Sequence, residues 1–434
     1  MSQTIGTDLE KVWDTPAAPA GRCPFSDVGA RFDPFDHASM HDSLAEARSA
    51  EPVFFSPELG YWVVTRYDDV LSILRDPARF SAANANTPIT PVPADVLAML
   101  RDGGYALEGI QVNCDPPRHT RIRNLASQLL SVKNFNRLEP AVRDIVTKSL
   151  DELEALPDKR GVDLVAKLTY ELPAKVIFTM LGIPEADAAQ VKQWSTNRLL
   201  LSFSRPSHAE QAESARNLLA FWHYCVALVA KRIDKPEDDY ASQLLRLRNG
   251  DDSVLTINEI NSAVFGLLFA GHETTTSQAT NLLNALLEDR TARDALRADP
   301  SLIPNAVEEG LRMYGAVANW RRRTLADVLI SGVEIPAGSN LVISFAAANR
   351  DPAIFENPDR FDVHRANSRR HLTFGNGIHM CRGAPLARME MKLLVEQFLA
   401  RFPDCVKSPG AEVEYARAFA FRAPHSLTVD LQEN

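Results

Sequence analysis

The sequence predicts a mainly α-helical protein with a small β region. Helical patterns follow one another in four stretches, at residues 138–156, 164–181, 186–201 and 208–235. A longer helical pattern runs from Thr256 to Leu287 and opens with the capping-box spacing of Thr256 and Glu259. Short alternating runs separated by turn residues predict two hairpins, at 52–55 with 61–65 and at 327–330 with 333–335.

Composition narrows the class of protein further. The chain has 434 residues and is 45% hydrophobic, which is enough to bury a large core. A net charge of −9 disfavours nucleic acid as a partner, because phosphate binding needs a basic surface. Five scattered cysteines, an odd number without close pairs, argue against a disulfide framework and against a zinc ribbon. We therefore expect a cytoplasmic protein in a reducing environment.

The N-terminal residues contain no apolar stretch as long as a signal peptide or a membrane anchor. They combine acidic residues with several alanines and prolines, so we expect residues 1–30 to form a disordered arm. Residues 31–434 show no linker at which the chain could be divided. We expect them to form a single domain with no membrane contact.

Two features of the first third of the chain point to ligand binding. Residues 81–109 lose the helical pattern, and a long irregular segment in a compact protein is more often a functional loop than an accident. A proline pair then opens a helix that places His119 and Arg123 four residues apart on one face. Two donors so placed could clamp a carboxylate, although a solvated basic face would show the same spacing.

The centre of the long helical pattern is chemically unusual. An apolar run ends at Ala270 and is followed by Gly271, His272, Glu273 and Thr274, which puts an acid and a hydroxyl deep in a packed helix. Ala270 and Gly271 offer a flat surface for a cofactor, and Glu273 with Thr274 could relay protons. A hydroxyl here can also bond back to a carbonyl and open the helix locally. Surface capping would explain many such pairs in isolation.

A glycine-rich loop places one cysteine just before a helix. Gly375, Gly377 and Gly383 permit backbone angles and close approaches that a Cβ would forbid, and Pro385 suits the first turn of the next helix. The positive end of that helix faces Cys381, which favours the thiolate. The alternative is that Cys381 is only a small buried apolar residue near a turn.

The run Phe-Gly-x-Gly-x-His-x-Cys-x-Gly, from Phe374 to Gly383, resembles the haem-thiolate signature of the cytochrome P-450 superfamily. The resemblance implies that family's fold, with haem b between a long central I helix and the cysteine-loop helix. It implies that Cys381 is the axial ligand of the haem iron and that Phe374 packs beside the sulfur. Gly375 and Gly383 belong to the same haem-binding loop, and His379 is expected to reach a haem propionate.

Two other segments resemble cofactor-contacting parts of the family. The helix with His119 and Arg123 resembles the C helix, in which these positions contact haem propionates. Arg322 occupies a further position that meets a propionate in the family. The stretch from Ala270 to Thr275 looks like the I helix, where the acid and alcohol pair delivers protons to dioxygen.

Three further charged residues are assigned to structure rather than to chemistry. Glu309 and Arg312 match the family's K-helix motif Glu-x-x-Arg, in which the two charges lie on one face, and Arg365 fits the third member of that structural ion network. An exposed ion pair of little energetic value is the alternative. Arg321 and Arg323, beside Arg322, are expected to point away to ion pairs or solvent.

The resemblance implies a haem-thiolate monooxygenase, which inserts one oxygen atom from O2 into a small apolar or aromatic substrate by hydroxylation or oxidative dealkylation. Electrons from NAD(P)H would arrive through a ferredoxin-type or reductase partner that docks near Cys381. Residues 56–66 and 299–309 look like the haem domains of self-sufficient, reductase-fused bacterial members. Six arginines could form a local basic patch for the partner: Arg118, Arg121, Arg369, Arg370, Arg382 and Arg388.

The substrate site is the part of the protein on which the sequence says least. Aromatic residues hint at an apolar pocket, although helical spacing would place some of them in the core. The candidate pocket residues are Phe203, Phe265, Phe269, Val317, Asn319, Trp320, Phe419 and Phe421. Two alternatives to the monooxygenase remain, a non-catalytic haem-thiolate sensor and a peroxide-driven peroxygenase, and neither needs the pair of Glu273 and Thr274.

Overall fold

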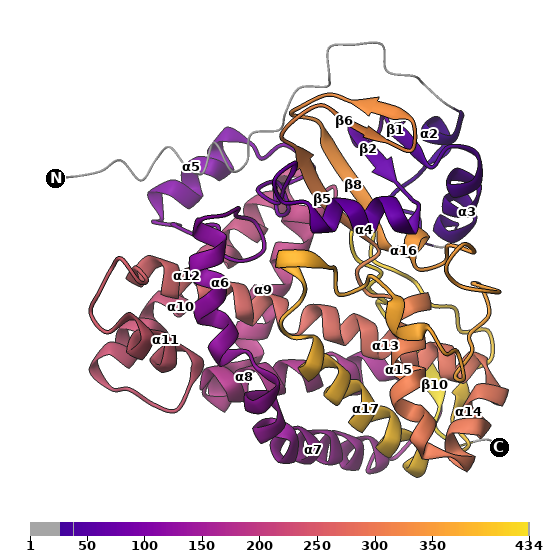
Figure 1. The fold of residues 1–434 in the computed structure, drawn as a ribbon. Helices are drawn as coiled ribbons and strands as arrows, with labels where there is room; N and C mark the ends of the chain where they lie inside the picture. The colour runs from indigo at the N-terminus through magenta and orange to yellow at the C-terminus, as the bar shows by residue number, and fades with distance from the viewer. Residues whose placement is uncertain (1–26, 38, 433–434) are drawn as a thin grey trace.

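The computed structural model describes residues 27–37 and 39–432, and Figure 1 shows a large helical body with the longer strands gathered at one end. Most of the expected disordered arm, residues 1–26, lies outside the described residues. Its last residues are not an arm, because Asp27–Arg31 form helix α2 against the first strand. Gly29 allows this close packing, since a Cβ there would lie 2.1 Å from the carbonyl oxygen of Phe55.

The helices of the first half of the chain follow the predicted stretches closely. They are α3 (Met40–Ala50), α4 (Tyr67–Arg75), α5 (Ala94–Asp102), α6 (Arg118–Leu129), α7 (Val132–Glu154), α8 (Leu172–Leu181), α9 (Glu185–Phe203) and α10 (His208–Asp234). One predicted helix, 164–181, is divided. Val165–Thr169 form a π-helical turn, and α8 starts anew after it with Pro173 in its first turn, where a missing N–H is tolerated.

The second half of the chain is also mostly helical. Its helices are α11 (Tyr240–Arg248), α12 (Ile257–Ala270), α13 (Glu273–Glu288), α14 (Arg290–Ala298), α15 (Ile303–Met313), α16 (Phe345–Ala348) and α17 (Ala384–Arg401). The pattern predicted as one helix to Leu287 is therefore two helices, α12 and α13, with a break at Gly271 and His272. Among the described helices, none combines the length and hydropathy needed to span a membrane.

The main sheet has five strands in the order β1-β2-β8-β5-β3. Its strands are β1 (Val53–Ser56), β2 (Tyr61–Val64), β3 (Phe80–Ser81), β5 (Asn319–Thr324) and β8 (Asn340–Ser344). Only β2 and β8 pair in parallel, and the other neighbours are antiparallel. The sheet brings residues near 62, 321 and 342 side by side, so it ties the start of the chain to a segment more than half the sequence away.

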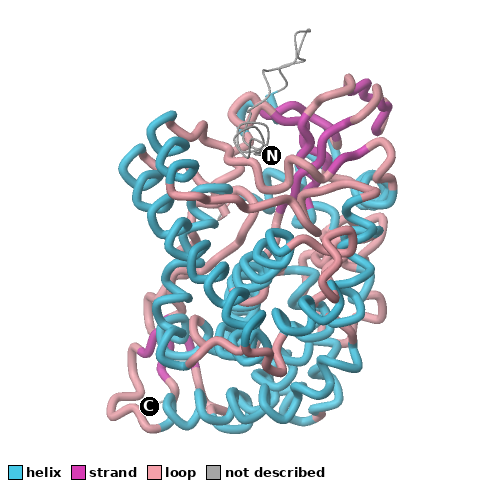
Figure 2. The backbone as a smooth tube through the Cα atoms, turned by 90° about the vertical axis from the view of Figure 1, so that its left-hand side faces the viewer, coloured by secondary structure: helices cyan, strands magenta, loops and turns pink. Residues whose placement is uncertain are grey.

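Two smaller sheets complete the β region. The predicted hairpin at 327–335 is formed by β6 (Val328–Ile330) and β7 (Val333–Ile335). A three-stranded sheet pairs β10 (Thr428–Asp430) with both β4 (Val162–Asp163) and β9 (Val406–Lys407). Figure 2 shows that the main sheet and the small C-terminal sheet lie at opposite ends of the molecule.

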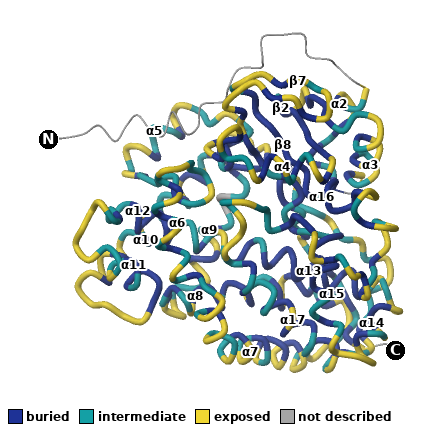
Figure 3. Tube along the Cα trace, in the orientation of Figure 1, coloured by how far each residue is buried: buried dark blue, intermediate teal, exposed yellow. Residues whose placement is uncertain are grey.

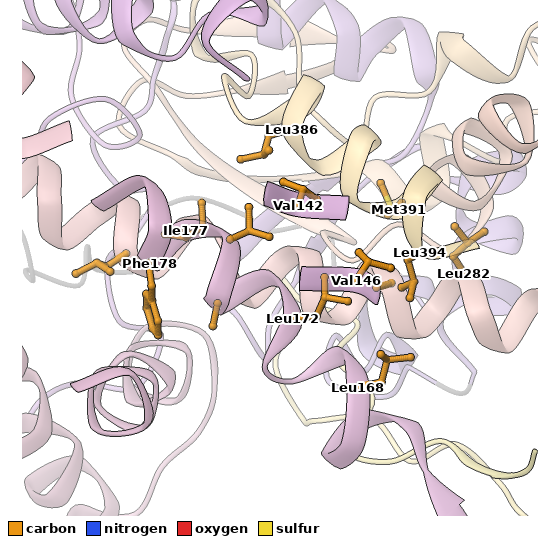
Figure 4. Packing of buried hydrophobic residues seen from close by; sticks show 14 of the residues in the cluster. Val142, Val146, Leu168, Leu172, Ile177, Phe178, Leu282, Leu386, Met391 and Leu394 are labelled. Atoms are coloured by element: carbon orange, nitrogen blue, oxygen red, sulfur yellow. The ribbon is translucent and has the colours of Figure 1, made fainter. Parts of the chain in front are cut away.

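The core lies where the long helices cross. Figure 3 shows buried backbone through the centres of α13 and α15 and exposed residues along the outer helices. In Figure 4 apolar side chains from five helical segments meet: Val142, Val146, Leu168, Leu172, Ile177, Phe178, Leu282, Leu386, Met391 and Leu394. α17, the helix that follows Cys381, shares this core with α7 and α13 and is therefore held firmly in place.

A buried ion network fixes the segment that leads to the cysteine loop. Arg312 donates two hydrogen bonds to Glu309, at 2.7 and 2.8 Å, and Arg365 donates a third at 2.9 Å. The side chains of Glu309 and Arg312 are fully buried. The remaining guanidinium hydrogens bind carbonyls of residues 349–360, so the sequence motif joins α15 to the irregular segment that follows α16.

Replacing Glu309 with Gln should destabilise the fold by about 3–5 kcal/mol, because two buried guanidinium groups would lose the one carboxylate that pairs with them among the described residues. The matched control is Glu58→Gln, which removes the exposed pair with Arg205 and should change stability by about 1 kcal/mol at most. The midpoints of urea denaturation of both variants measure this difference. Equal shifts in the two variants would contradict a structural role for the network.

Candidate functional site

The cysteine loop turns through two glycines in the left-handed region. Gly375 has a φ of +68° and Gly377 a φ of +69°, which L side chains rarely adopt. Gly377 also approaches the end of α4, where a Cβ would lie 2.3 Å from the carbonyl oxygen of Leu74. The loop closes where the N–H of Cys381 donates to the carbonyl of Phe374 at 2.8 Å. Gly383 differs, because its φ of −75° is open to any residue.

Cys381 lies three residues before α17 (Ala384–Arg401) and borders a cavity. Although the residue is exposed on the cavity side, the protein that encloses its sulfur raises the pKa of the thiol. The N–H groups of Gly383 and Ala384, at the positive end of α17, act in the opposite direction, as does the charge of Arg123. The sulfur therefore faces a chamber, with donors behind it that favour the thiolate.

The cavity has a volume of about 330 Å³ and collects most of the predicted cofactor residues. From the helix break, Ala270, Gly271 and Thr274 form one wall. The cysteine loop forms the opposite wall. The predicted residues that line the cavity are Arg123, Ala270, Gly271, Thr274, Val317, Trp320, Arg322, Phe374, Gly375, His379, Cys381 and Gly383. The tertiary fold thus brings together segments that lie far apart in the chain, from Arg123 to Gly383.

Four nitrogen-bearing side chains gather at the rim, and several of their donors have no partner. The rings of His119 and His379 lie 4.2 Å apart, centroid to centroid. His379 Nδ1 contacts the carbonyl of Gln111 at 2.9 Å, whereas its Nε2, both ring nitrogens of His119 and Nε of Arg123 are buried without a hydrogen-bond partner among the described residues. Unpaired buried donors are costly, so a missing acceptor is implied here.

The pKa values of this cluster indicate the charge of that acceptor. Burial lowers the pKa of Arg123 and that of Arg322, each to about 10. For His379, burial and then the charge of Arg322 lower the pKa to about 3, and the pKa of His119 falls by burial and by Arg123. The lowered pKa values leave the imidazoles neutral, and the two guanidinium groups are enclosed beside them, so an anionic group placed between the guanidinium groups would be stabilised.

The helix break positions Thr274 as the sequence suggests. Its hydroxyl donates to the carbonyl of Ala270 at 3.3 Å, which bridges the interruption between α12 and α13, and the residue borders the cavity. Gly271 serves a second purpose, because a Cβ there would lie 2.5 Å from Cδ1 of Ile177 on α8. The absence of that Cβ lets α8 pack directly on the break.

Glu273 points away from the cavity into a polar cluster with α9. Its carboxylate accepts hydrogen bonds from Lys192 at 2.7 Å and Thr196 at 2.9 Å, and His272 Nε2 lies 3.0 Å away. Burial by itself would raise the pKa of Glu273, but His272 and Lys192 outweigh burial and hold it well below its usual range. The predicted acid is therefore an ionised carboxylate that is tied to Lys192.

Most candidate pocket residues lie in the core instead of the cavity wall. Val317 and Trp320 line the cavity, whereas Phe203, Phe265, Asn319, Phe419 and Phe421 are buried in packed clusters. Phe269 is partly exposed on α12 and is not among the lining residues. Aromatic content could not separate core from pocket, because both environments favour the same side chains.

The predicted basic patch is only partly free. Arg121 binds Glu259 at 2.6 Å, and Arg118 contacts the same carboxylate at 3.2 Å. Arg388 is held by Glu308 at 2.7 Å, with its guanidinium over the ring of Phe374. The exposed members are Arg369, Arg370 and Arg382. Neighbouring glutamates, which the spacing of arginines could not reveal, neutralise the other three, and Glu308 also lies 3.6 Å from the exposed Arg369.

Comparison with known proteins shows to which family the chain belongs. A family model described as Cytochrome P450 matches residues 90–410 of the chain. The chain belongs to the cytochrome P450 family. Its fold, mainly helical with small sheets, is the cytochrome P450 fold, and the enzyme is a cytochrome P450 monooxygenase.

Named relatives and solved structures agree with this placement. The cytochrome P450 monooxygenase PikC of Streptomyces venezuelae is 36% identical over 400 residues, which cover 90% of this chain and 91% of PikC. Cytochrome P450 CREJ in complex with (4-ethylphenyl) dihydrogen phosphate is 34% identical with a TM-score of 0.90, over 93% of this chain and 99% of CREJ. An intact type IV self-sufficient cytochrome P450 monooxygenase is 38% identical with a TM-score of 0.89, over 94% of this chain and 54% of that chain.

The site of this P450 contains two groups of residues that sequence reasoning did not find. Lys192 and Thr196, one turn apart on α9, hold the carboxylate of Glu273. Their spacing of four residues places them on one helix face, but nothing in the local sequence says what that face meets. Gln111 orients His379 through a backbone carbonyl, which no sequence pattern can report.

The two left-handed glycines of the loop provide a matched test. Alanine at either position meets an unfavourable backbone conformation, at roughly 1–2 kcal/mol. Only Gly377→Ala also drives a Cβ into the backbone of Leu74, which should destabilise the protein by about a further 2 kcal/mol. Thermal denaturation midpoints and haem content should fall more in Gly377→Ala than in Gly375→Ala, which has open space around its Cβ position. The reverse order would contradict this account of the loop.

Proposed function

We propose that this P450 binds haem b with Cys381 as the axial ligand and oxidises a small apolar or aromatic substrate by hydroxylation or oxidative dealkylation. One observation carries the proposal: Cys381 and Thr274 border the same cavity, and the rim of that cavity holds buried donors that find no acceptor in the part of the chain that the structure describes. A thiolate, a hydroxyl and a place for an anionic cofactor are thus provided by three separate segments.

The rim cluster suits the two propionates of haem. His119, Arg123, Arg322 and His379 would bind these carboxylates, which would supply the missing acceptors and offset the enclosed positive charge. Phe374 and Gly375 would pack beside the sulfur, and Ala270 with Gly271 would face the ring from α12. When bound, haem supplies iron for dioxygen reduction, and a thiolate ligand favours O–O cleavage.

The protein's own groups would control the supply of protons. Thr274 offers a hydroxyl at the cavity wall, and its neighbour Glu273 is ionised and bound to Lys192. We propose that Thr274 holds water and passes protons inward, while Glu273 reaches the cavity only after it exchanges Lys192 for water. The ion pair with α9 would then regulate the relay, because movement of that helix changes how tightly the acid is held.

The cavity wall supports the proposed class of substrate. Val317 and Trp320 give it an apolar and aromatic surface, which favours a ligand of the same kind. The solved complex of CREJ contains (4-ethylphenyl) dihydrogen phosphate, an aromatic ligand in a related protein. This likeness supports the aromatic side of the proposal.

Electrons from NAD(P)H would reach the haem through a ferredoxin-type or reductase partner near Cys381. Arg369, Arg370 and Arg382 are exposed on or beside the cysteine loop and would contact an acidic partner. The likeness to a self-sufficient enzyme, of which this chain covers 54%, supports a reductase as one form of that partner.

Thr274→Ala should leave haem binding intact but lower product formed per O2 consumed by roughly tenfold or more, with a matching rise in peroxide release. The physical reason is the loss of the hydroxyl that supplies protons at the cavity wall. The control is Thr179→Ala, because Thr179 on α8 makes the same type of bond, to the carbonyl of Lys175, on an exposed surface. Unchanged coupling in Thr274→Ala would contradict the relay, and turnover with peroxide alone would favour the peroxygenase reading.

Arg382→Glu should slow reduction of the haem by an acidic ferredoxin by roughly tenfold at low salt, since rim charges act mainly on association rates. The difference from the parent should shrink as ionic strength rises. The control is Arg290→Glu, which reverses an exposed charge on α14. Stopped-flow reduction measures both, and equal behaviour of the two variants would place the docking surface elsewhere.

A further inference from the structure

A buried arginine beside the haem pocket has no role in the proposed chemistry. Arg321 lies on β5 next to Arg322, and only 1% of its surface is exposed. It was expected to reach an ion pair or solvent, but among the described residues no carboxylate pairs with it. A guanidinium buried without an acid is unfavourable unless its donors are satisfied, so its presence calls for a reason.

The two terminal nitrogens of Arg321 bind backbone carbonyls from separate parts of the chain. Nη1 donates to the carbonyl of Thr87, and Nη2 donates to those of Ala85 at 2.9 Å and Ser202 at 3.4 Å. Its Nε is buried without a hydrogen-bond partner among the described residues. Tyr61 on β2 opposes the effect of burial, which lowers the pKa of Arg321. One planar group therefore joins the irregular segment after β3, the end of α9 and the central sheet.

Aromatic rings enclose the same guanidinium. Its carbon lies 5.0 Å from the ring centroid of Phe203 and 5.0 Å from that of Phe419, within the range of cation–π attraction. Phe203 in turn stacks on Trp320, with centroids 5.8 Å apart and ring planes at 29°. Phe203, a candidate pocket residue, therefore lies in the core and packs behind Trp320, which does line the cavity.

The two carbonyls nearest the guanidinium flank a residue of the cavity wall. Asn86 stands between Ala85 and Thr87 and lines the cavity. A second bond, from Nδ2 of Asn84 to the carbonyl of Arg322 at 3.0 Å, fixes the same segment on β5. Asn86 is therefore held in position by hydrogen bonds that its chain neighbours make, and not by its own side chain.

We propose that Arg321 is a positioning residue for substrate selection, which holds residues 84–87 and the end of α9 on β5 and thereby fixes Asn86 and Trp320 in the cavity wall. The inference rests on the proposed function for what the cavity accepts. A carboxamide and an indole held in register suit an aromatic ligand that carries a hydrogen-bonding substituent.

The chain offers sharp variants for a test. Arg321→Met keeps the length of the side chain but removes every donor, and Arg321→Lys keeps the charge but cannot bridge three carbonyls with one planar group. Arg323→Met is the matched control, because Arg323 is exposed two residues along the same strand and bonds only the carbonyl of Gly338 among the described contacts. Asn86→Ala removes the proposed wall contact directly.

The experiment uses the haem-loaded enzyme and two measurements that need no turnover. Spectral titration with imidazole and with 4-phenylimidazole reports how the cavity treats a small and a larger aromatic ligand. In Arg321→Met and Arg321→Lys, affinity for 4-phenylimidazole relative to imidazole should fall by roughly tenfold, and amide hydrogen exchange at residues 82–90 should accelerate by roughly tenfold. Asn86→Ala should change relative affinity without faster exchange, and Arg323→Met should change neither.

These outcomes decide the matter even if one variant folds poorly. If Arg321→Met fails to retain haem, Arg321→Lys provides the test, since lysine keeps the charge and the approximate volume of arginine. The proposal is overturned if Arg321→Lys keeps the parental affinity ratio and exchange rate, or if Arg323→Met changes them as much. Failure of the proposed oxygenase function would show separately, as absence of O2-dependent product while the spectral and exchange differences persist.

Discussion

Two successive buried glutamates on α15 connect the scaffold to the site. Glu309 accepts from Arg312 and Arg365 and so fixes the segment that leads into the cysteine loop. Glu308, its neighbour, faces the loop itself, where it contacts His371 at 3.0 Å and Arg388 at 2.7 Å. Burial would raise the pKa of Glu308, but His371 and Arg388 outweigh it and lower the pKa to about 2. Glu308 is therefore ionised. Through Glu308 and Glu309, the single helix α15 holds the loop and α17 from one side.

The cavity that this scaffold shapes has a clear division of charge. Cationic and imidazole groups gather at the rim, where donors of His119, His379 and Arg123 lack acceptors among the described residues. The acid of the site, Glu273, instead lies behind the wall and is bound to Lys192. An anionic group is thus favoured at the rim, while the carboxylate of Glu273 is held outside the apolar chamber by α9. The same helix also ends beside Arg321, so its position would affect both proton supply and substrate fit.

The three adjacent arginines on β5 have different surroundings. Arg322 faces the cavity rim, Arg321 donates hydrogen bonds to backbone carbonyls in the core, and Arg323 reaches the surface beside Gly338. Alternation along the strand separates Arg322 from Arg321 and Arg323. Arg321 and Arg323 share one face and differ because the core covers Arg321 while Arg323 lies at the surface. In the sequence the three look alike, and only their partners distinguish them.

The sequence by itself determined the class of fold and the chemistry of the centre, because those depend on local patterns. Capping at Thr256, the hydroxyl of Thr274 bonding back to Ala270 and the left-handed glycines before Cys381 are all contacts or conformations within a few residues. The tertiary structure alone decided which arginines remain free, which aromatics line the cavity and where the carboxylate of Glu273 points. Those outcomes depend on residues far away in the chain, such as Glu259, Lys192 and Thr87, and a local pattern carries no information about a partner that folding brings from a distance.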